Sequence, residues 1–294
     1  MKKVTVVGHI AMDFIFSIPY FPEKNYSIYI KKMGKYFGGG AANIAVGISK
    51  LGCRSEIISA VPKNFSESKY GRYLKENNVG LCVAKFNEKI AQAYIFNDEK
   101  KNQITYFYWG VSEKMDEMEG IAREYVHIAP SHPSLATKMA EKGKYVAYEP
   151  GQDLPKWNKE GLSYVLEKIA ILFCNNFELK EIERKVGMKK EALVKHMDII
   201  VTKGKEGSIV YTKDKKISIP VVPAEIVDPT GAGDAYKAAF WAGLMKGYDM
   251  EIACKMGSTA ASMVVEKMGA QNGLPDWKTL CQKYQQHFGD IENI

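Results

Sequence analysis

The segment "DPTGAGDAY" (residues 228–236) places two glycines and two carboxylates within nine positions. Gly231 and Gly233, on either side of Ala232, let the backbone turn several N–H groups toward one point. An apolar helical pattern follows, so the positive end of a helix is expected at the same point, which predicts an anion cradle. Asp234 would repel a phosphate bound there. We therefore expect it to accept the proton of a hydroxyl that attacks phosphorus while the amides stabilise the developing charge.

The same segment also has a purely structural interpretation. Asp234 would then only favour the helix dipole, and Asp228 would cap the turn before Pro229. The rest of the chain has to decide between these two interpretations.

A second group of residues comes from the N-terminal part of the chain. The sequence "GHIAMD" puts Asp13 just past a predicted strand, and "GGGAAN" (38–43), with Gly39 and Asn43, opens a predicted helix. Because ligands bind outside the carboxyl ends of parallel strands, both stretches can reach one site. An aspartate that accepts two hydroxyl hydrogen bonds beside glycines suits a ribose or another polyol. Asn43 stands where a dinucleotide fingerprint needs glycine, and a Walker A segment is absent, so those nucleotide motifs are disfavoured.

A third group follows two later predicted strands. In "NNFE" (175–178), Asn175 and Glu178 can organise a hydrated Mg²⁺ beside phosphates, although the same pattern is an ordinary helix cap. In "TKGKEG" (202–207), Thr202, Gly204 and Gly207 can approach a nucleotide, although a turn into a hairpin also needs glycine.

These motifs need a framework that brings them together. Short apolar runs predict buried strands of a parallel sheet, and the segments between them have helical spacing. We expect strands at 4–8, 55–61, 125–129, 145–149, 170–175 and 198–204, helices at 41–52, 66–77, 134–142, 159–168, 178–186 and 189–196, and a mostly helical segment over 231–287. Strands that alternate with helices in this way predict an open α/β sheet with helices on both faces.

Two stretches depart from this rhythm. Residues of about 14–37 and 91–110 alternate like strands, and a polar "NDEKKN" divides the second into a hairpin. They predict a small β-sheet lid, with one apolar face that covers a cleft or pairs with a second subunit. We expect a homodimer formed through this lid.

Composition excludes several classes of protein. The chain has 294 residues with 41 basic and 34 acidic side chains, and the positive charges are scattered, so neither a nucleic-acid partner nor a membrane is expected. Five widely separated cysteines and the short apolar run at the N-terminus predict a cytoplasmic protein with free thiols.

Together the motifs resemble the ribokinase-like (PfkB) family of carbohydrate and nucleoside kinases. The matching set is GxxxxD at 8–13, GGxxxN at 38–43, NxxE at 175–178, TKGxxG at 202–207 and DPTGAGDAY at 228–236. The resemblance implies a single Rossmann-type three-layer α/β/α kinase domain over 1–294, with ATP as phosphoryl donor and Mg²⁺ as the metal. It also implies roles for individual residues: Asp234 as general base, the amides of Gly231, Ala232 and Gly233 as anion hole, Asp13, Gly39 and Asn43 at the acceptor hydroxyls, Asn175, Thr202, Gly204 and Gly207 on the ATP side, and Glu178 acting on Mg²⁺ through water.

The lid sequence bears on the acceptor. The tract "NQITYFYWG" (102–110) resembles the archaeal nucleoside kinases of this family, and its alternation puts Gln103, Thr105, Phe107 and Trp109 on one strand face. A ring-rich face suits stacking on a base, and Gln92 and Gln103 could bind the base or the sugar. The expected reaction is phosphoryl transfer to the 5′-hydroxyl of a nucleoside whose ribose diol lies on Asp13.

The sequence leaves two alternatives open. A sugar or sugar-phosphate kinase is the alternative, because Lys31, Lys32 and Lys35 near the lid could accept a phosphate. Lys237, on the same side of its helix as Asp234, could approach a phosphate, orient the carboxylate or lie along the body of the protein.

Overall fold

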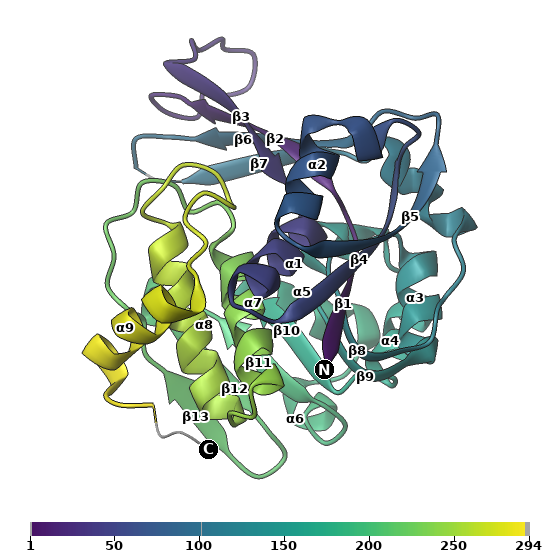
Figure 1. Ribbon diagram of the computed structural model, residues 1–294, viewed down its shortest axis with the longest axis vertical. Coiled ribbons are helices and arrows are strands. Elements are labelled where there is room, and N and C mark those ends of the chain that lie inside the picture. Colours follow the sequence, from purple (N-terminus) through teal and green to yellow (C-terminus); the bar gives the residue numbers. More distant parts are fainter. Residues whose placement is uncertain (1, 101, 292–294) are drawn as a thin grey trace.

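The main body of the protein is one large twisted sheet covered by helices (Figure 1). The computed structural model describes residues 2–100 and 102–291. Nine strands lie in the order β13-β12-β11-β10-β9-β8-β1-β4-β5. Their bounds are β1 Lys3–Val7, β4 Arg54–Pro62, β5 Val79–Phe86, β8 Arg123–Ile128, β9 Gly143–Tyr148, β10 Ile171–Asn175, β11 Asp198–Thr202, β12 Ser208–Tyr211 and β13 Lys216–Ile219. From β11 to β5 every neighbouring pair is parallel, whereas β12 and β13 form an antiparallel edge.

Side chains of the parallel strands alternate between two apolar cores, which explains why the strands read as continuous hydrophobic runs. On β10, Phe173 points into one core and Leu172 into the other. The first core is covered by α1 Gly40–Lys50, α2 Lys69–Glu76, α7 Ala232–Met245, α8 Met250–Val264 and α9 Trp277–Phe288. The second is covered by α3 Pro133–Lys142, α4 Lys159–Leu166, α5 Asn176–Val186 and α6 Lys190–Leu193. The result is a three-layer α/β/α body.

A second sheet forms a lid at one end of the body, at the top of Figure 1. Its order is β3-β2-β6-β7, with bounds β2 Ala11–Ser17, β3 Lys32–Gly38, β6 Ala91–Asn97 and β7 Gln103–Tyr108. Strand alternation and pairing define its two faces. The inner face carries Asp13, Ile15, Ala93, Ile95 and Phe107, and the outer face carries Phe14, Phe16, Tyr94, Phe96 and Tyr106.

The chain order within the main sheet fixes where a ligand can bind. From β1 the chain leads to β4 on one side, and β8 joins β1 on the other, so the strand order reverses between β1 and β8. The crevice outside the carboxyl ends at such a switch point is the usual ligand site of a doubly wound sheet. Strand β2, which carries Asp13, begins at Ala11 directly after β1, so the lid rises from this edge.

The predicted framework is confirmed in its main features. All six predicted strands are present, all six predicted helices appear within a few residues of their expected bounds, and the segments of the lid form their own sheet. Strands β5 and β13 lie outside the predicted set, and β12 adds an antiparallel strand where glycines at 204 and 207 only suggested a turn.

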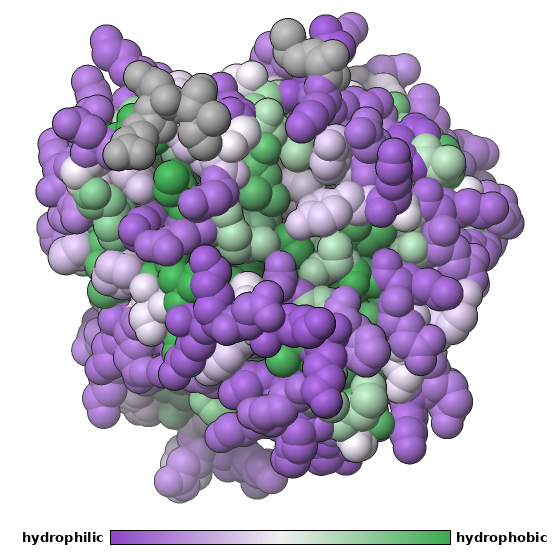
Figure 2. Space-filling model, turned by 90° about the horizontal axis from the view of Figure 1, so that it is seen from below, coloured by the Kyte–Doolittle hydropathy of each residue, from purple (hydrophilic) through white to green (hydrophobic). Residues whose placement is uncertain are grey.

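Among the described residues no helix has both the length and the apolarity to span a bilayer. The end of the molecule opposite the lid is largely hydrophilic, with apolar side chains visible between polar ones (Figure 2).

The five cysteines are free thiols, as their spacing predicts, and the cytoplasmic location stays a prediction.

Candidate active site

The anion cradle predicted from the glycines lies at the start of α7. Gly231 is the N-cap of this helix and has a left-handed conformation, with φ of 81°. A side chain on Gly231 would collide with Ala270, so both the conformation and the space require glycine. The next three residues, Ala232, Gly233 and Asp234, form the first turn of α7, where a helix start offers N–H groups to an anion. The Ala232 N–H also donates to the Pro229 carbonyl at 3.2 Å, which closes the turn before the helix.

Asp234 is held from one side by a buried amide network. Its Oδ2 atom accepts a hydrogen bond of 2.8 Å from Nδ2 of Asn43, which lies on α1. Nε2 of Gln271 donates to Oδ1 of Asn43 at 2.8 Å and to the Tyr70 hydroxyl at 2.9 Å. Because Oδ1 of Asn43 is committed to Gln271, its NH₂ group must face Asp234. The network therefore fixes which way the Asn43 amide points.

Burial changes the acidity of Asp234. It raises the pKa of this carboxyl from its ordinary value of 3.8 to about 6, while the nearby Lys237 ammonium lowers the pKa and the Glu149 carboxylate raises it. A base with a pKa close to neutrality accepts a proton more readily than an ordinary aspartate, and it is still ionised at pH 7. The position suits general-base chemistry.

Asp13 lies on the inner face of the lid, close to Asp234. Its side chain is almost fully buried, and burial together with the charges of Asp234 and Asp228 raises its pKa from 3.8 to about 8. A side chain on Gly38 would collide with the Asp13 carboxylate, and one on Gly39, which has φ of 91°, would collide with the backbone of residues 9–11. Gly38 and Gly39 thus let the start of α1 approach this acid closely.

Asp228 connects the lid to the turn that precedes the anion cradle. Its Oδ1 accepts hydrogen bonds from the backbone and hydroxyl of Thr230, and its Oδ2 accepts one from the Gly269 amide. From the lid, Nδ2 of Asn97 reaches Oδ1 of Asp228 at 3.4 Å, and Nε2 of Gln103 donates to the Thr230 hydroxyl at 3.1 Å. The role of Asp228 here is more than the local turn cap considered from the sequence.

The residues predicted for the phosphoryl donor lie at the carboxyl ends of β10 and β11, where Asn175 and Thr202 are paired neighbours. Asn175 and Glu178 form a capping box: Oδ1 of Asn175 accepts from the Phe177 and Glu178 amides, and Oε2 of Glu178 accepts from the Asn175 amide. Gly204 faces open space, whereas a side chain on Gly207 would collide with Ile219 of β13. Gly207 therefore has a packing reason to be glycine.

The donors that could hold a metal are few. In residues 2–100 and 102–291, no group of three or more acidic, histidine or cysteine side chains could hold an ion. Burial raises the pKa of the Glu178 carboxyl, and Lys237 lowers it. A single carboxylate beside bound phosphates is the arrangement that suits a largely hydrated Mg²⁺, so Glu178 fits that ion better than a fully protein-bound one.

Aromatic side chains form the wall between the lid and the body. The ring of His9, two residues after the end of β1, lies 4.6 Å from that of Phe107 on the inner face and 5.0 Å from that of Trp109. Nε2 of His9 is 2.8 Å from Oδ2 of the buried Asp153, and Nδ1 of His9 is buried without a partner among the described residues. This wall was predicted for Phe107 and Trp109, whereas the partner of His9 was not.

Not every predicted residue belongs to this group. Alternation puts Gln92 opposite Met12 on the outer face, where its Oε1 accepts a hydrogen bond of 2.5 Å from the Tyr94 hydroxyl. The lid as positioned here therefore turns Gln92 away from Asp13. Gln103 is on the inner face but bonds to Asn97 and Thr230.

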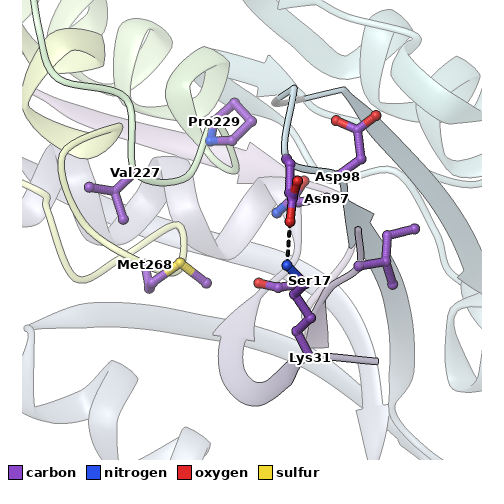
Figure 3. A pocket seen from close by; sticks show the side chains of 9 residues that line it. Ser17, Lys31, Asn97, Asp98, Val227, Pro229 and Met268 are labelled. Carbon is purple, nitrogen blue, oxygen red and sulfur yellow. Dashed lines mark hydrogen bonds and ion pairs between the residues drawn. The ribbon is translucent and has the colours of Figure 1, made fainter. Parts of the chain in front are cut away.

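Beside these lid contacts lies a cavity of about 170 Å³ (Figure 3). Ser17, Lys31 and Asn97–Glu99 line it from the lid, and Val227, Pro229 and Met268 line it from the body. Lys31 forms an ion pair with Glu99 at its edge. The cavity marks the space that separates the tip of the lid from the loop leading to Asp234.

Four residues of the site were missed from the sequence. Glu149 ends a predicted strand on the ligand-binding edge, and that position alone could have signalled it. Tyr70, Asp153 and Gln271 lie in a helix, a short turn and a loop without any local pattern that points to a ligand.

The comparison with known families decides the assignment. The model of the pfkB family carbohydrate kinase matches residues 1–277. The chain belongs to this kinase family. The kinase is 42% identical to a nucleoside kinase of Methanocaldococcus jannaschii, with 98% of each chain covered, and 34% identical to a nucleoside kinase of Methanothermobacter thermautotrophicus, with 98% and 97% covered. The crystal structure of the M. jannaschii nucleoside kinase superimposes on this kinase with a TM-score of 0.90 at 41% identity, over 98% and 99% of the two chains. The family and the fold predicted from the sequence are thus confirmed.

Proposed function

We propose that this kinase transfers the γ-phosphoryl group of ATP to the 5′-hydroxyl of a nucleoside. The observation that carries the proposal is the pairing of two acids, the buried Asp13 and Asp234, whose side chain is 19% exposed; their charges act on each other beneath an aromatic lid face. One acid suits the binding of a diol, and the other suits proton acceptance at the anion cradle. The strong similarity to two nucleoside kinases supports the same acceptor class.

The acceptor is expected between the lid and α1. The ribose diol would donate to the Asp13 carboxylate, close to Gly39 and Asn43. The base would then lie toward the rings of Phe107 and His9, which can stack on a purine or pyrimidine. This orientation directs the 5′-hydroxyl toward Asp234.

Transfer would depend on charge and position more than on covalent chemistry. Asp234 accepts the hydroxyl proton late in the reaction, while the amides of Gly231, Ala232 and Gly233 stabilise the charge on the transferred group. Asn175, Thr202 and Gly204 would line the ATP side, and the exposed Val221 and Ile226 offer apolar surface to the adenine. Glu178 would hold a hydrated Mg²⁺, which when bound neutralises phosphate charge.

The lysines of the lid weigh against a sugar-phosphate acceptor. Lys31 forms an ion pair with Glu99, and Lys35 pairs with Phe14 on the outer face. Lys32 of β3 is on the same face as Asp13, but it pairs with Ser17 of β2. Ser17 is four residues beyond Asp13, a distance of about 13 Å along the strand. A phosphate on a sugar bound at Asp13 would therefore meet no basic side chain from β3 at close range.

A panel of acceptors tests the proposal. ADP release with ATP and Mg²⁺ should be at least about 100-fold faster, as kcat/KM, for the best nucleoside than for ribose, fructose or fructose 6-phosphate. The Asp13→Asn variant should raise KM for the nucleoside by about 10-fold or more, whereas Asp214→Asn, in the exposed turn before β13, should not change it. Preference for a sugar or its phosphate would reverse the assignment.

We also propose that the outer face of the lid pairs two copies of the chain. Tyr106 and Tyr108 on the edge strand β7 and Met33 on the edge strand β3 are 64%, 52% and 64% exposed. Stacked rings of Phe14 with Tyr94 and of Phe16 with Phe96 extend this apolar surface. Light scattering should give a dimer for the native chain and a monomer for Tyr106→Glu, with Tyr164→Glu on α4 as control. A monomeric native chain at micromolar concentration would contradict this pairing.

A further inference from the structure

A buried ion pair lies directly under the first turn of α7. Lys237 follows Asp234 by three residues, and its ammonium is ion-paired with the Glu149 carboxylate at the end of β9. The same ammonium nitrogen is 3.7 Å from Oδ1 of Asp234. The side chains of Lys237 and Glu149 are only 10% and 9% exposed. One buried positive charge therefore lies between two carboxylates.

The partners of Glu149 fix the position of this charge. Nε1 of Trp241, one turn after Lys237 on α7, donates a hydrogen bond of 3.0 Å to Nδ1 of His127 on β8. An indole N–H can only donate, so Nδ1 is the acceptor and the proton of the neutral ring is on Nε2. Nε2 lies 3.3 Å from Oε1 of Glu149 and donates to it. Burial lowers the pKa of His127, which keeps the ring neutral.

These contacts form a closed ring of interactions. Lys237 and Trp241 project from the same face of α7, because four residues separate them. Trp241 orients His127, His127 orients Glu149, and Glu149 holds Lys237. A flexible lysine that only covered apolar surface would not need such a fixed set of buried partners.

We propose that Lys237 is a positioning residue, whose ammonium, fixed by Glu149, keeps the Asp234 carboxylate charged and aimed at the acceptor hydroxyl. The inference rests on the proposed function, in which Asp234 accepts the proton. Two restraints then act on the base: Asn43 holds Oδ2, and Lys237 attracts Oδ1.

The charge balance around Asp234 shows why the ammonium matters. The ionisable groups that act on Asp234 or are acted on by it come from four elements: Lys237 on α7, Glu149 after β9, Asp13 on β2 and Tyr70 on α2. Only Lys237 among them carries a positive charge. Without it, burial and the remaining acid groups would all favour the protonated form of Asp234, which cannot act as a base.

The first experiment compares pH–rate profiles of the whole enzyme with the best nucleoside of the acceptor panel. Loss of a close opposite charge raises a carboxyl pKa by about one unit or more, so Lys237→Met should move the acid limb of kcat, measured at saturating nucleoside, upward by about that amount. At pH 6, where the native Asp234 is about half ionised, the rate should fall by about 5-fold relative to the native enzyme, with recovery by pH 9. Lys237→Arg should retain the native limb. Lys237→Met combined with Glu149→Gln should move the limb back toward the native position, because the unpaired acid is gone.

Controls separate positioning from a merely structural role. Lys246→Met removes a lysine from the C-terminal end of the same helix, where its ammonium lies over the Trp277 ring, and should leave the profile unchanged. A structural role for Lys237 would lower the rate equally at every pH. An acid limb that does not move in folded Lys237→Met would overturn the inference, and Lys237→Gln serves if the methionine variant does not fold.

A second readout needs no substrate. Asp234→Asn should stabilise the Lys237→Met protein against urea more than it stabilises the native protein, because the carboxylate has lost its ammonium. Additive effects would contradict the Lys237–Asp234 interaction whatever the activity. If the coupling is present but Asp234→Asn is fully active, the proposed role of the base fails and the contact stands.

Discussion

Replacing Asp234 by asparagine should inactivate the enzyme and stabilise its fold at the same time. The amide has nearly the same shape and can still accept the hydrogen bond from Asn43, but it cannot take up a proton. We expect kcat to fall by at least about 100-fold, with the KM for the nucleoside largely unchanged, because the loss concerns the transition state.

The gain in stability follows from the acidity of this residue. The folded pKa of about 6 lies above the ordinary 3.8, so the folded state binds the Asp234 proton more tightly than the unfolded state does. The resulting penalty on folding builds as the pH rises above about 4 and is complete above about 6, where this difference in pKa corresponds to roughly 3 kcal/mol. Below about pH 4 the group is protonated in both states and the penalty disappears.

Urea unfolding at two pH values measures this directly. At pH 8, Asp234→Asn should raise the free energy of unfolding by about 1–3 kcal/mol, the lower end allowing for the buried amide. At pH 4 the variant and the native protein should be nearly equal. Asp214→Asn, in the exposed turn before β13, controls for a general loss of charge. Near-normal turnover, or equal stability at pH 8, would refute the reasoning from burial.

Three further outcomes are expected. Because the pKa of Asp13 is raised to about 8, nucleoside binding to its ionised form should release a proton, and KM should fall about tenfold per pH unit as the pH rises toward 8; calorimetry in two buffers measures the proton. Gly231→Ala should lower the free energy of unfolding by about 2 kcal/mol and reduce kcat, since the new methyl collides with Ala270; no change in urea unfolding would contradict this. Gln271→Leu should reduce kcat about tenfold with little change in thermal stability, because Asn43 could then turn its oxygen toward Asp234, and unchanged kcat would count against the network.

The sequence predicted those parts of the site that have a local signature. Gly231 and Gly39 stand where the backbone takes a positive φ, and Asp13 and Asp234 follow a strand and a helix start, so residue type and position were enough. Gln92 stays a prediction, because an alternating strand reveals two faces without saying which one meets the ligand, and its pairing with Met12 puts it on the face opposite to Asp13.

The remaining residues depend on contacts between distant parts of the chain. Gln271 and Asn43 are 228 positions apart, and Trp241 and His127 are 114 apart, so only the finished fold brings each pair together. Neither residue pair lies on a repeating pattern. The edge strand β13 was missed for a related reason, since its four residues are too few to show alternation.

The hydrogen bonds from Gln103 to Thr230 and from Asn97 to Asp228 join the lid to the turn just before the anion cradle. Any outward swing of the lid has to break both of them, and the turn then loses two of its anchors. An open enzyme that has bound ATP but no acceptor would thus hold its reactive centre less firmly when water can enter. The hydrogen bonds that hold the lid closed would therefore also limit the hydrolysis of ATP by water in the absence of an acceptor.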